Sequence, residues 1–403
     1  MGWFTAQDMR RLGAAWRGGV AGACLALASH AQAGDGSTGY RVDHRFIARE
    51  GITPSGGLVS GLAGQLYGVT EAGGAGPGEG CGTIYAVDPS SGREHTLHRF
   101  TGEDGEGCLA LGTLWRGPDG SLFGATYNGG SGHAGTLFSL APDGTFTTLH
   151  AFSGDADGQG PNGSLVRAAD GRLYGTTAQG GAHGRGTVFA LAPDGTFQVL
   201  HAFRHGDPLG EAPASGLTVG AGNVLFGTAA DGAFGVGTVY RVDMSGTLGL
   251  VHAFKASEGT FLGSLTAASD GALVGVAVGG GAEGAGTLFH LQPDGQLVTL
   301  HDFSGGVDDG AAPRDAPIEV SVGVFYGTTL GNGDDVPGTV YRFDVASSSM
   351  ATLHRFGRAP GDGRWPVGPL AVGADGRLHG ATMRGGNLKL QGQGTGTVFR
   401  VGG

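Results

Sequence analysis

The sequence predicts an all-β protein: a seven-bladed β-propeller of four-stranded antiparallel blades, with the last blade closed by the N-terminal strand. A His-x-Phe tripeptide recurs seven times at spacings of 49 to 54 residues, and periods near fifty are typical of solenoids and propellers. Between these tripeptides, short apolar segments alternate with glycine-rich turns, which is typical of brief strands. The seven motif histidines are His44, His98, His150, His201, His252, His301 and His354.

The repeat without insertions, Ser164 to Phe203, shows the order of elements within one unit. A first strand over Ser164–Ala168 ends at an Asp-Gly hairpin signal, and a second strand follows over Arg172–Thr177. A glycine-rich loop precedes a third strand over Gly186–Leu191. A Pro-Asp-Gly turn then leads into the fourth strand, Phe197–Phe203. Four antiparallel strands per unit are what a propeller blade requires.

The two ends of the repeat array predict how the ring closes. Tyr40–Phe46 is a fourth strand without the three strands that should precede it, and the last unit stops after its third strand at Val401. An open stack would leave both edges unpaired, which natural sheets avoid. We therefore expect Tyr40–Phe46 to pair with Gly396–Val401 and to complete the seventh blade.

The connections separate into two faces. Tight Asp-Gly turns join the first strand to the second and the third to the fourth, whereas long loops make the other connections. The long loops therefore share one rim, where we expect any binding site. Cys81 and Cys108 fall in two such loops of adjacent blades, so we expect one disulfide bond between them, with two unpaired thiols as the alternative.

The first 33 residues predict a secretory signal peptide. Three arginines precede the apolar stretch Gly18–Ala28, and Ala31-Gln32-Ala33 resembles a cleavage site. The apolar stretch is too short to span a bilayer, so we expect no membrane span after cleavage. A twin-arginine signal at Arg10-Arg11 and a lipoprotein box ending at Cys24 are the alternatives. The division is then a signal peptide over 1–33, a short linker over 34–39 and the propeller over 40–403, exported to the periplasm or the exterior.

The overall charge excludes one class of partner. The net charge is −11, and such a surface repels phosphate backbones, so we expect no nucleic-acid partner. We expect a monomer.

The combined motif runs Leu-Tyr-Gly-Thr-Thr, Gly-Gly, Gly-x-Gly-Thr-Val-Phe, Pro-Asp-Gly and Leu-His-x-Phe, and its best examples are Leu173–Phe189 and Leu137–Pro161. It resembles the "choice-of-anchor tandem repeat GloVer-containing" family of exported bacterial proteins over about Arg41 to Val401. The resemblance implies no established catalytic activity and no active-site residues. Members often end in an anchoring segment, whereas here nothing follows the third strand of the last unit, so we expect no anchor.

The seven histidines do not predict a metal site. They lie on the fourth strand, about three strand spacings or roughly 14 Å outside the innermost one, whereas zinc ligands meet within about 2 Å of one point. We interpret them as packing and hydrogen-bonding residues between blades, and we expect no metal.

The loops after the His-x-Phe motif are acidic, and Asp155 and Asp157 resemble part of a calcium loop. Asn332–Asp335 is a second, weaker candidate. Solvated turn carboxylates are the favoured interpretation, so we expect no cofactor, with calcium as the alternative. The acidic residues are Glu103, Asp104, Glu106, Asp155, Asp157, Asp308, Asp309 and Asp362.

The function predicted is an exported, non-catalytic binding module for an envelope or extracellular carbohydrate or protein. Aromatic groups beside the long loops can stack on sugar rings, although each can instead plug its own loop. The alternative is a polysaccharide-directed hydrolase or lyase that uses two carboxylates among Asp231, Glu283, Asp315 and Asp335, and a third interpretation is a structural or adhesion protein. The ligand-binding candidates are Tyr127, Asn128, Phe234, Phe261, Asp315 and Trp365.

Overall fold

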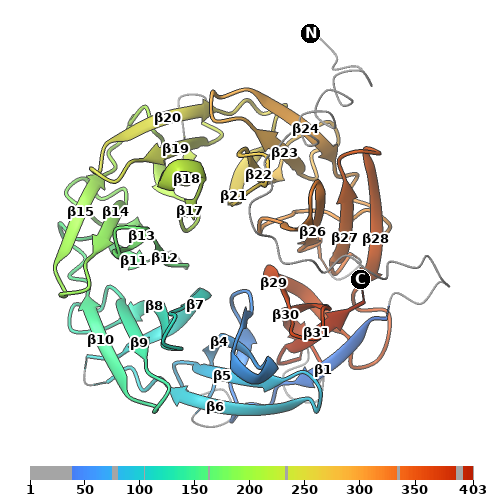
Figure 1. Ribbon diagram of the computed structural model, residues 1–403, viewed down its shortest axis with the longest axis horizontal. Helices are drawn as coiled ribbons and strands as arrows, with labels where there is room; N and C mark the ends of the chain where they lie inside the picture. Colours follow the sequence, from blue (N-terminus) through green and yellow to red (C-terminus); the bar gives the residue numbers. More distant parts are fainter. Residues whose placement is uncertain are drawn as a thin grey trace.

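The computed structural model of the chain describes residues 39–74, 80–103, 105–161, 164–231, 235–333, 336–386 and 394–402. In this part of the chain, seven antiparallel sheets surround a common axis, as Figure 1 shows. The fold is the seven-bladed β-propeller that the repeat predicts. The expected signal peptide and the linker up to residue 38 lie outside the described residues. No helix in the described ranges is long and apolar enough to cross a membrane.

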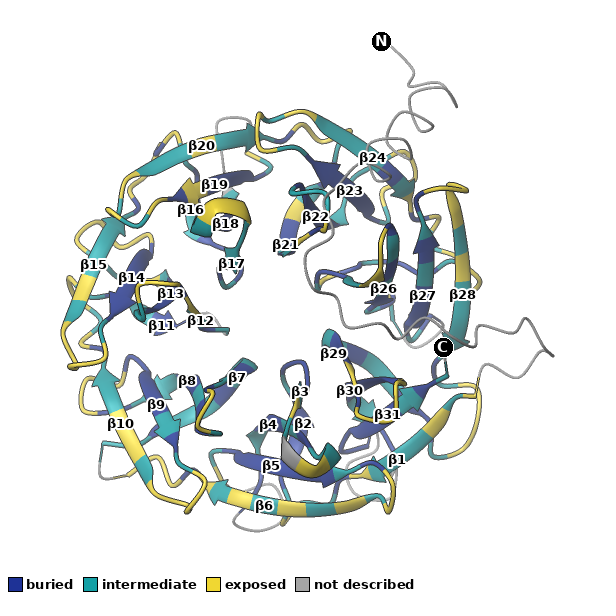
Figure 2. Cartoon of the chain, viewed as in Figure 1, coloured by how far each residue is buried: buried dark blue, intermediate teal, exposed yellow. Residues whose placement is uncertain are grey.

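Within each blade the strands follow one another from the axis outward. We number the blades 1 to 7 along the chain, beginning with the blade that contains β4. The third strand β14 is buried along its whole length because neighbouring blades cover it, whereas the outer strand β6 alternates between exposed and half-buried residues (Figure 2). The second strands are β4 (Leu66–Ala72), β8 (Leu122–Gly129), β13 (Leu173–Gln179), β18 (Leu225–Asp231), β22 (Leu273–Gly279), β26 (Val324–Thr329) and β30 (Leu378–Gly385). The third strands are β5 (Thr83–Asp88), β9 (Thr136–Leu140), β14 (Thr187–Leu191), β19 (Thr238–Val242), β23 (Thr287–Leu291), β27 (Thr339–Asp344) and β31 (Thr397–Val401). The outer strands are β6 (Arg93–Arg99), β10 (Phe146–Ala151), β15 (Phe197–Ala202), β20 (Leu248–Ala253), β24 (Leu297–Asp302), β28 (Ser349–Arg355) and β1 (Arg41–Arg45).

In six of the seven blades the innermost strand starts earlier than the sequence predicts; in blade 6 it starts at Ile318, in the predicted pair Pro317-Ile318. We expected the innermost strands to begin at pairs such as Gly57-Leu58 and Ser164-Leu165, but pairing already starts at Ile52 in blade 1 and at Gln159 in blade 3. The predicted pairs mark an interruption, after which the chain rejoins the same second strand. The innermost strands are β2 (Ile52–Pro54) with β3 (Val59–Ser60), β7 (Gly107–Arg116), β11 (Gln159–Pro161) with β12 (Val166–Arg167), β16 (Glu211–Pro213) with β17 (Thr218–Val219), β21 (Thr260–Ala267), β25 (Ile318–Ser321) and β29 (Gly363–Val372), and the short 3-10 turns are η1 (Leu62–Gly64) and η2 (Ala221–Asn223).

The apolar core consists of seven clusters, each lying between two neighbouring blades. In blade 5 the ring of Phe289 lies over Gly275, where a Cβ atom would be 2.5 Å from the ring. The motif phenylalanine of the preceding blade, Phe254, packs on Phe289 with ring centroids 5.0 Å apart. The glycine of the second strand thus makes room for the ring that receives the neighbouring blade. The seven ring pairs are Phe46–Tyr85, Phe100–Phe138, Phe152–Phe189, Phe203–Tyr240, Phe254–Phe289, Phe303–Tyr341 and Phe356–Phe399.

The N-terminal strand closes the ring as predicted. β1 pairs antiparallel with β31, and the two strands lie side by side at the outside of blade 7 (Figure 1). Asp43 of β1 is completely buried, and its carboxylate lies 3.4 Å from Nε of Arg400 and 3.6 Å from Nδ1 of His379. Just beyond β1, Phe46 reaches Tyr85 of blade 1. One strand therefore completes a sheet and supplies the ring contact to the next blade.

The predicted disulfide bond is present and joins blades 1 and 2. Cys81 lies between β4 and β5, whereas Cys108 lies within β7 and not in a loop as we expected. At the equivalent place between blades 3 and 4, Arg185 and Glu211 form an ion pair of 3.3 Å. The same position between blades thus carries a disulfide bond at one interface and an ion pair at another.

We predict that deleting residues 34–47 lowers the Tm by about 10 °C or more, because it removes β1 and leaves the Tyr85 ring without Phe46. The deletion also leaves the buried His379 and Arg400 without the charge of Asp43. Calorimetry of the two purified chains measures the difference. Deletion of residues 34–38 alone keeps every described contact and is the control; an unchanged melt after the longer deletion would count against closure by β1.

We predict that the Cys81→Ser, Cys108→Ser double variant loses about 3.5 kcal/mol of unfolding free energy, from the loop entropy of a 27-residue separation. Urea unfolding with and without reductant measures the loss, because reductant should lower the midpoint of the natural chain and leave the variant unchanged. Free thiols in the unfolded, unreduced mature chain would refute the bridge.

Candidate ligand-binding face

The long connections lie together on one side of the ring, which we call the long-loop face, as the sequence predicts. Within a blade, the loop between the second and third strands is tied to the loop that enters the blade. The N–H of Gly130 donates to the carbonyl of Glu106 at 2.7 Å, and the N–H of Gly181 donates to that of Asp155 at 2.7 Å. Equivalent bonds recur in blades 1, 5, 6 and 7. Backbone hydrogen bonds therefore fix these loops, and differences between blades reside mainly in the side chains.

Each motif histidine holds a carboxylate of the loop that follows it. In blade 2, Nε2 of His150 lies 3.1 Å from Asp157, and the imidazole also stacks on Phe197 of blade 3 with ring centroids 3.8 Å apart. These contacts agree with the interpretation of the histidines as packing and hydrogen-bonding residues. No group of three or more metal-ligating side chains forms within the described residues. The seven pairs are His44–Glu50, His98–Glu106, His150–Asp157, His201–Asp207, His252–Glu258, His301–Asp309 and His354–Asp362, at 2.8 to 3.5 Å.

The favoured interpretation of the loop acids as solvated turn residues is wrong for four of them: Glu106, Asp157, Asp309 and Asp362 are partners of the histidines. Asp157 also accepts the hydroxyl and the N–H of Ser153, so both its oxygens have protein partners. Its neighbour in the calcium hypothesis, Asp155, is exposed, as are Glu103 and Asp308. Asp104, Asp334 and Asp335 lie outside the described residues.

These pairs shift the pKa of their members. Burial lowers the pKa of His150 and of His98, against the opposing effect of their carboxylates. Burial raises the pKa of Asp309, but hydrogen bonds from His301 and Ser304 outweigh burial, and the pKa lies below its ordinary value. The lowered pKa values favour the neutral imidazole of His98 and His150 at neutral pH.

In each blade one residue at an equivalent position, within the innermost strand or just before it, has φ between 49° and 61°, in the left-handed region. In six of the seven blades its N–H donates at 2.8 to 3.1 Å to a carbonyl of the preceding blade. This bond offsets a backbone cost of about 1–2 kcal/mol for a residue other than glycine. We call the seven residues the inner rim; they are Thr53, Leu109, Gly160, Ala212, Phe261, Ala312 and Trp365.

The aromatic candidates do not all lie at one place in the structure. Phe261 and Trp365 belong to the inner rim; 67% of Phe261 is exposed, and Trp365 is half-buried. Tyr127 instead packs towards the next blade, where its ring takes the space of a Cβ atom at Gly160. Its half-buried neighbour, Asn128, accepts the hydroxyl of Thr126 with its carbonyl. Phe234 lies outside the described residues.

Asp315 connects two blades. Its carboxylate accepts the N–H of Gly368 in blade 7 at 2.8 Å. Burial raises its pKa, while Arg314 and the Gly368 bond lower it in part. Asp315 therefore positions blade 7 against blade 6.

Charges from two other blades act on Glu71 of blade 1. Burial raises the pKa of this carboxyl group, and Arg384 of blade 7 and Arg314 of blade 6 offset the increase in part. The Nε atom of Arg384 is buried and has no hydrogen-bond partner among the described residues. A half-buried carboxylate and two arginines on consecutive blades are the type of arrangement that marks functional sites.

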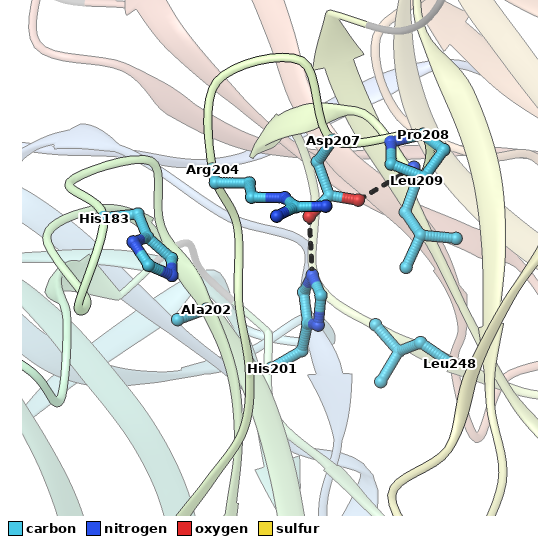
Figure 3. Close-up of a pocket in the computed structure, with 8 residues that line it drawn as sticks. All are labelled: His183, His201, Ala202, Arg204, Asp207, Pro208, Leu209 and Leu248. Atoms are coloured by element: carbon cyan, nitrogen blue, oxygen red, sulfur yellow. Dashed lines mark hydrogen bonds and ion pairs between the residues drawn. The ribbon is translucent and has the colours of Figure 1, made fainter.

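A pocket of about 470 Å³ opens on the long-loop face between blades 3 and 4 (Figure 3). His183 forms one wall, Leu209 and Leu248 form the opposite wall, and the end of the Arg204 side chain lies above the His201 ring. His201 lies between the walls and is held by Asp207 at 3.0 Å.

The carboxylates of the enzyme alternative have separate surroundings. Glu283 is exposed between β22 and β23, whereas Asp315 is bound to the backbone of blade 7. Asp335 and the side chain of Asp231 lie outside the description.

Four candidate site residues were not predicted from the sequence: Glu71, Arg384, His183 and Arg204. The available signal was departure from the repeat: Glu71 stands three residues after the Leu-Tyr-Gly glycine, where the other blades have uncharged residues such as Tyr127. The interaction of Glu71 with Arg384 depends on the closed ring, because these two residues belong to blades 1 and 7.

We predict that the Tm falls as the pH is lowered from 7 to 5. His98 and His150 have lowered pKa values in the folded chain, so the unfolded chain takes up protons first, below a pH of about 6.5. Below about pH 4 the lowered pKa of Asp309 adds a second loss. The His98→Gln, His150→Gln double variant should flatten the first step and keep the second. Calorimetry from pH 2 to 8 measures both losses; an equal first step in the variant would contradict the assignment.

A family model described as the Gloeobacter/Verrucomicrobia repeat matches residues 12–167, 79–273 and 228–402. No curated protein matches the chain.

Several solved structures are similar in fold. A putative 6-phosphogluconolactonase from Bacteroides uniformis is 18% identical, with a TM-score of 0.51 and coverage of 75% of this chain and 84% of that chain. The extracellular domain of a putative one-component system from B. thetaiotaomicron is 10% identical, with a TM-score of 0.54 and coverage of 87% and 39%. TolB from Acinetobacter baumannii is 14% identical, with a TM-score of 0.46 and coverage of 73% and 64%. At these identities the similarity concerns the fold alone.

The matches to the repeat model overlap and extend over nearly the whole chain, and the structure contains seven copies of one four-stranded unit. The chain belongs to the Gloeobacter/Verrucomicrobia (GloVer) repeat family.

Proposed function

We propose that this propeller is an exported binding module whose ligand is a carbohydrate of the cell envelope or exterior, held on the long-loop face at the inner rim. The observation that carries the proposal is Phe261, a large apolar side chain that is 67% exposed on a left-handed backbone. Such a residue costs conformational energy and exposes apolar surface. A role in recognition accounts for both costs.

The neighbourhood of the inner rim combines aromatic and charged groups. Trp365 supplies a second ring, and Glu71, Arg314 and Arg384 supply charges that come together across blades 7, 1 and 6. Aromatic faces suit the apolar faces of sugar rings, and carboxylate and guanidinium groups suit their hydroxyls. This combination favours a saccharide.

Export is supported by the predicted signal peptide and by the Cys81–Cys108 bond. Disulfide bonds persist in the periplasm and outside the cell and are rare in the cytosol.

We predict that the mature chain binds a polysaccharide on a glycan array, saturably and without releasing products. Phe261→Gly should weaken this binding about tenfold, because a stacked ring is lost. Its Tm should stay equal or rise by about 2 °C, because glycine adopts a positive φ without strain. Trp365→Ala should also weaken binding, and titration calorimetry with the polysaccharide found on the array measures both affinities.

Val322→Ala is the matched control: Val322 is 62% exposed and lies by the tight turn between β25 and β26, on the opposite face. Equal binding by all variants would place the ligand elsewhere. Release of reducing ends would favour the hydrolase or lyase alternative, and a blank array with capture of a defined envelope protein would favour a protein ligand.

A further inference from the structure

The pocket between blades 3 and 4 lies at a position where three other interfaces have an aromatic side chain. Each motif histidine faces a side chain of the next blade. This side chain belongs to the residue four positions before that next blade's own motif histidine. At two interfaces this residue is a phenylalanine: Phe146 stacks on His98 with ring centroids 4.1 Å apart, and Phe197 stacks on His150. Opposite His201 the equivalent residue is Leu248, which lines the pocket.

At a third interface the equivalent residue is Tyr40, four residues before His44, and it stacks on His354. Another interface closes by a different contact, because Nδ1 of His252 lies 3.1 Å from the carbonyl of Gly295 in the next blade. Between blades 3 and 4 the turn equivalent to that of Gly295 contains Gly246 and lies against Leu200 instead. A Cβ atom at Gly246 would be 3.1 Å from the Leu200 side chain. The His201 ring therefore borders an open space of about 470 Å³, within the size range of small-molecule sites.

The pocket presents positive charge in an acidic protein whose net charge is −11. Arg204 and His183 are exposed, and neither side chain has a hydrogen-bond or ion-pair partner in the described part of the chain. The carboxylate in the pocket is already bound: Asp207 is buried and accepts from Nε2 of His201 and from the N–H of Leu209, both at 3.0 Å. An incoming anion thus meets an unpaired guanidinium and a carboxylate with both oxygens occupied.

The two walls differ in character. Figure 3 shows His183 on one side of His201, the aliphatic side chains of Leu209 and Leu248 on the other, and the end of the Arg204 side chain above the His201 ring. A ligand that matches both walls carries a carboxylate on a ring with an apolar face. Arginine binds carboxylates through two parallel N–H···O bonds, which gives such a site its orientation.

We propose that this pocket binds a hexuronic acid unit of an acidic polysaccharide, with the carboxylate on Arg204 and His183 and the sugar face against Leu248. The carboxylate part of the inference comes from the pocket itself, whereas the choice of a sugar rests on the proposed function. The pocket lies at the outer part of blades 3 and 4 and is separate from the inner rim. The chain would then bind a carboxylate in this pocket and stack a sugar ring at the inner rim.

Titration of the mature chain with galacturonate, galactose and inorganic phosphate, followed by saturation-transfer NMR and calorimetry at low ionic strength, tests the proposal. Galacturonate should bind, and galactose and phosphate should bind at least tenfold more weakly. Arg204→Gln should weaken galacturonate binding at least tenfold. Arg358→Gln is the matched control, because Arg358 is an exposed arginine in the corresponding loop of blade 6.

Leu248→Phe tests the pocket without removing charge. The new ring restores the side chain found at Phe146 and Phe197 and should stack over His201, so the variant should fold with an equal or higher Tm and lose galacturonate binding. Absence of galacturonate binding, equal binding of galactose or phosphate, or unchanged binding by Arg204→Gln or Leu248→Phe would each overturn the proposal.

The inner rim variant separates this proposal from the proposed function. Phe261→Gly should leave galacturonate binding unchanged. Galacturonate binding with a blank glycan array would refute the proposed function and retain the pocket, whereas array binding without galacturonate binding would refute the pocket alone.

Discussion

Packing between blades is the constraint on which the structure depends. The phenylalanine of each His-x-Phe motif meets a third-strand ring of the next blade, and that ring lies over a glycine of its own second strand. Each aromatic pair contributes about 1 kcal/mol beyond the burial of its surface. A blade cannot bury this surface alone, so the ring has to close. The pairing of β1 with β31 and the contact of Phe46 with Tyr85 meet that requirement.

The histidine of the same motif extends this architecture to the long-loop face. In six of the seven blades the carboxylate that it holds lies three residues before an inner-rim residue. The histidine thereby fixes how the chain leaves one blade and enters the next, as His150 does with Asp157. Each motif histidine and one acid of the loop that follows it are therefore partners of each other. Chemistry available to a ligand resides in residues that depart from the repeat, such as Phe261, Glu71 and Arg204.

Where a blade departs from the repeat, the surface changes in a definite way. Gly160 accommodates the ring of Tyr127, whereas Phe261 at the equivalent position is exposed. Leu248 in place of a phenylalanine leaves the space beside His201 open. The regular part of the unit supplies a rigid frame, and single substitutions in it create the features that can select a ligand.

The repeat period, the turn residues and the unpaired strand at each end determined the number of blades, the strands of each blade and the closure of the ring, because these follow from local propensity and from the need to pair every edge. Only the tertiary structure decided which ring each phenylalanine contacts and which carboxylate each motif histidine holds. It also decided the early start of most innermost strands and the interaction of Glu71 with Arg314 and Arg384. The physical reason is distance along the chain: residues in neighbouring blades are about fifty positions apart, and residues in blades 1 and 7 are separated by most of the sequence. Contacts of this kind exist only after the blades have closed into a ring.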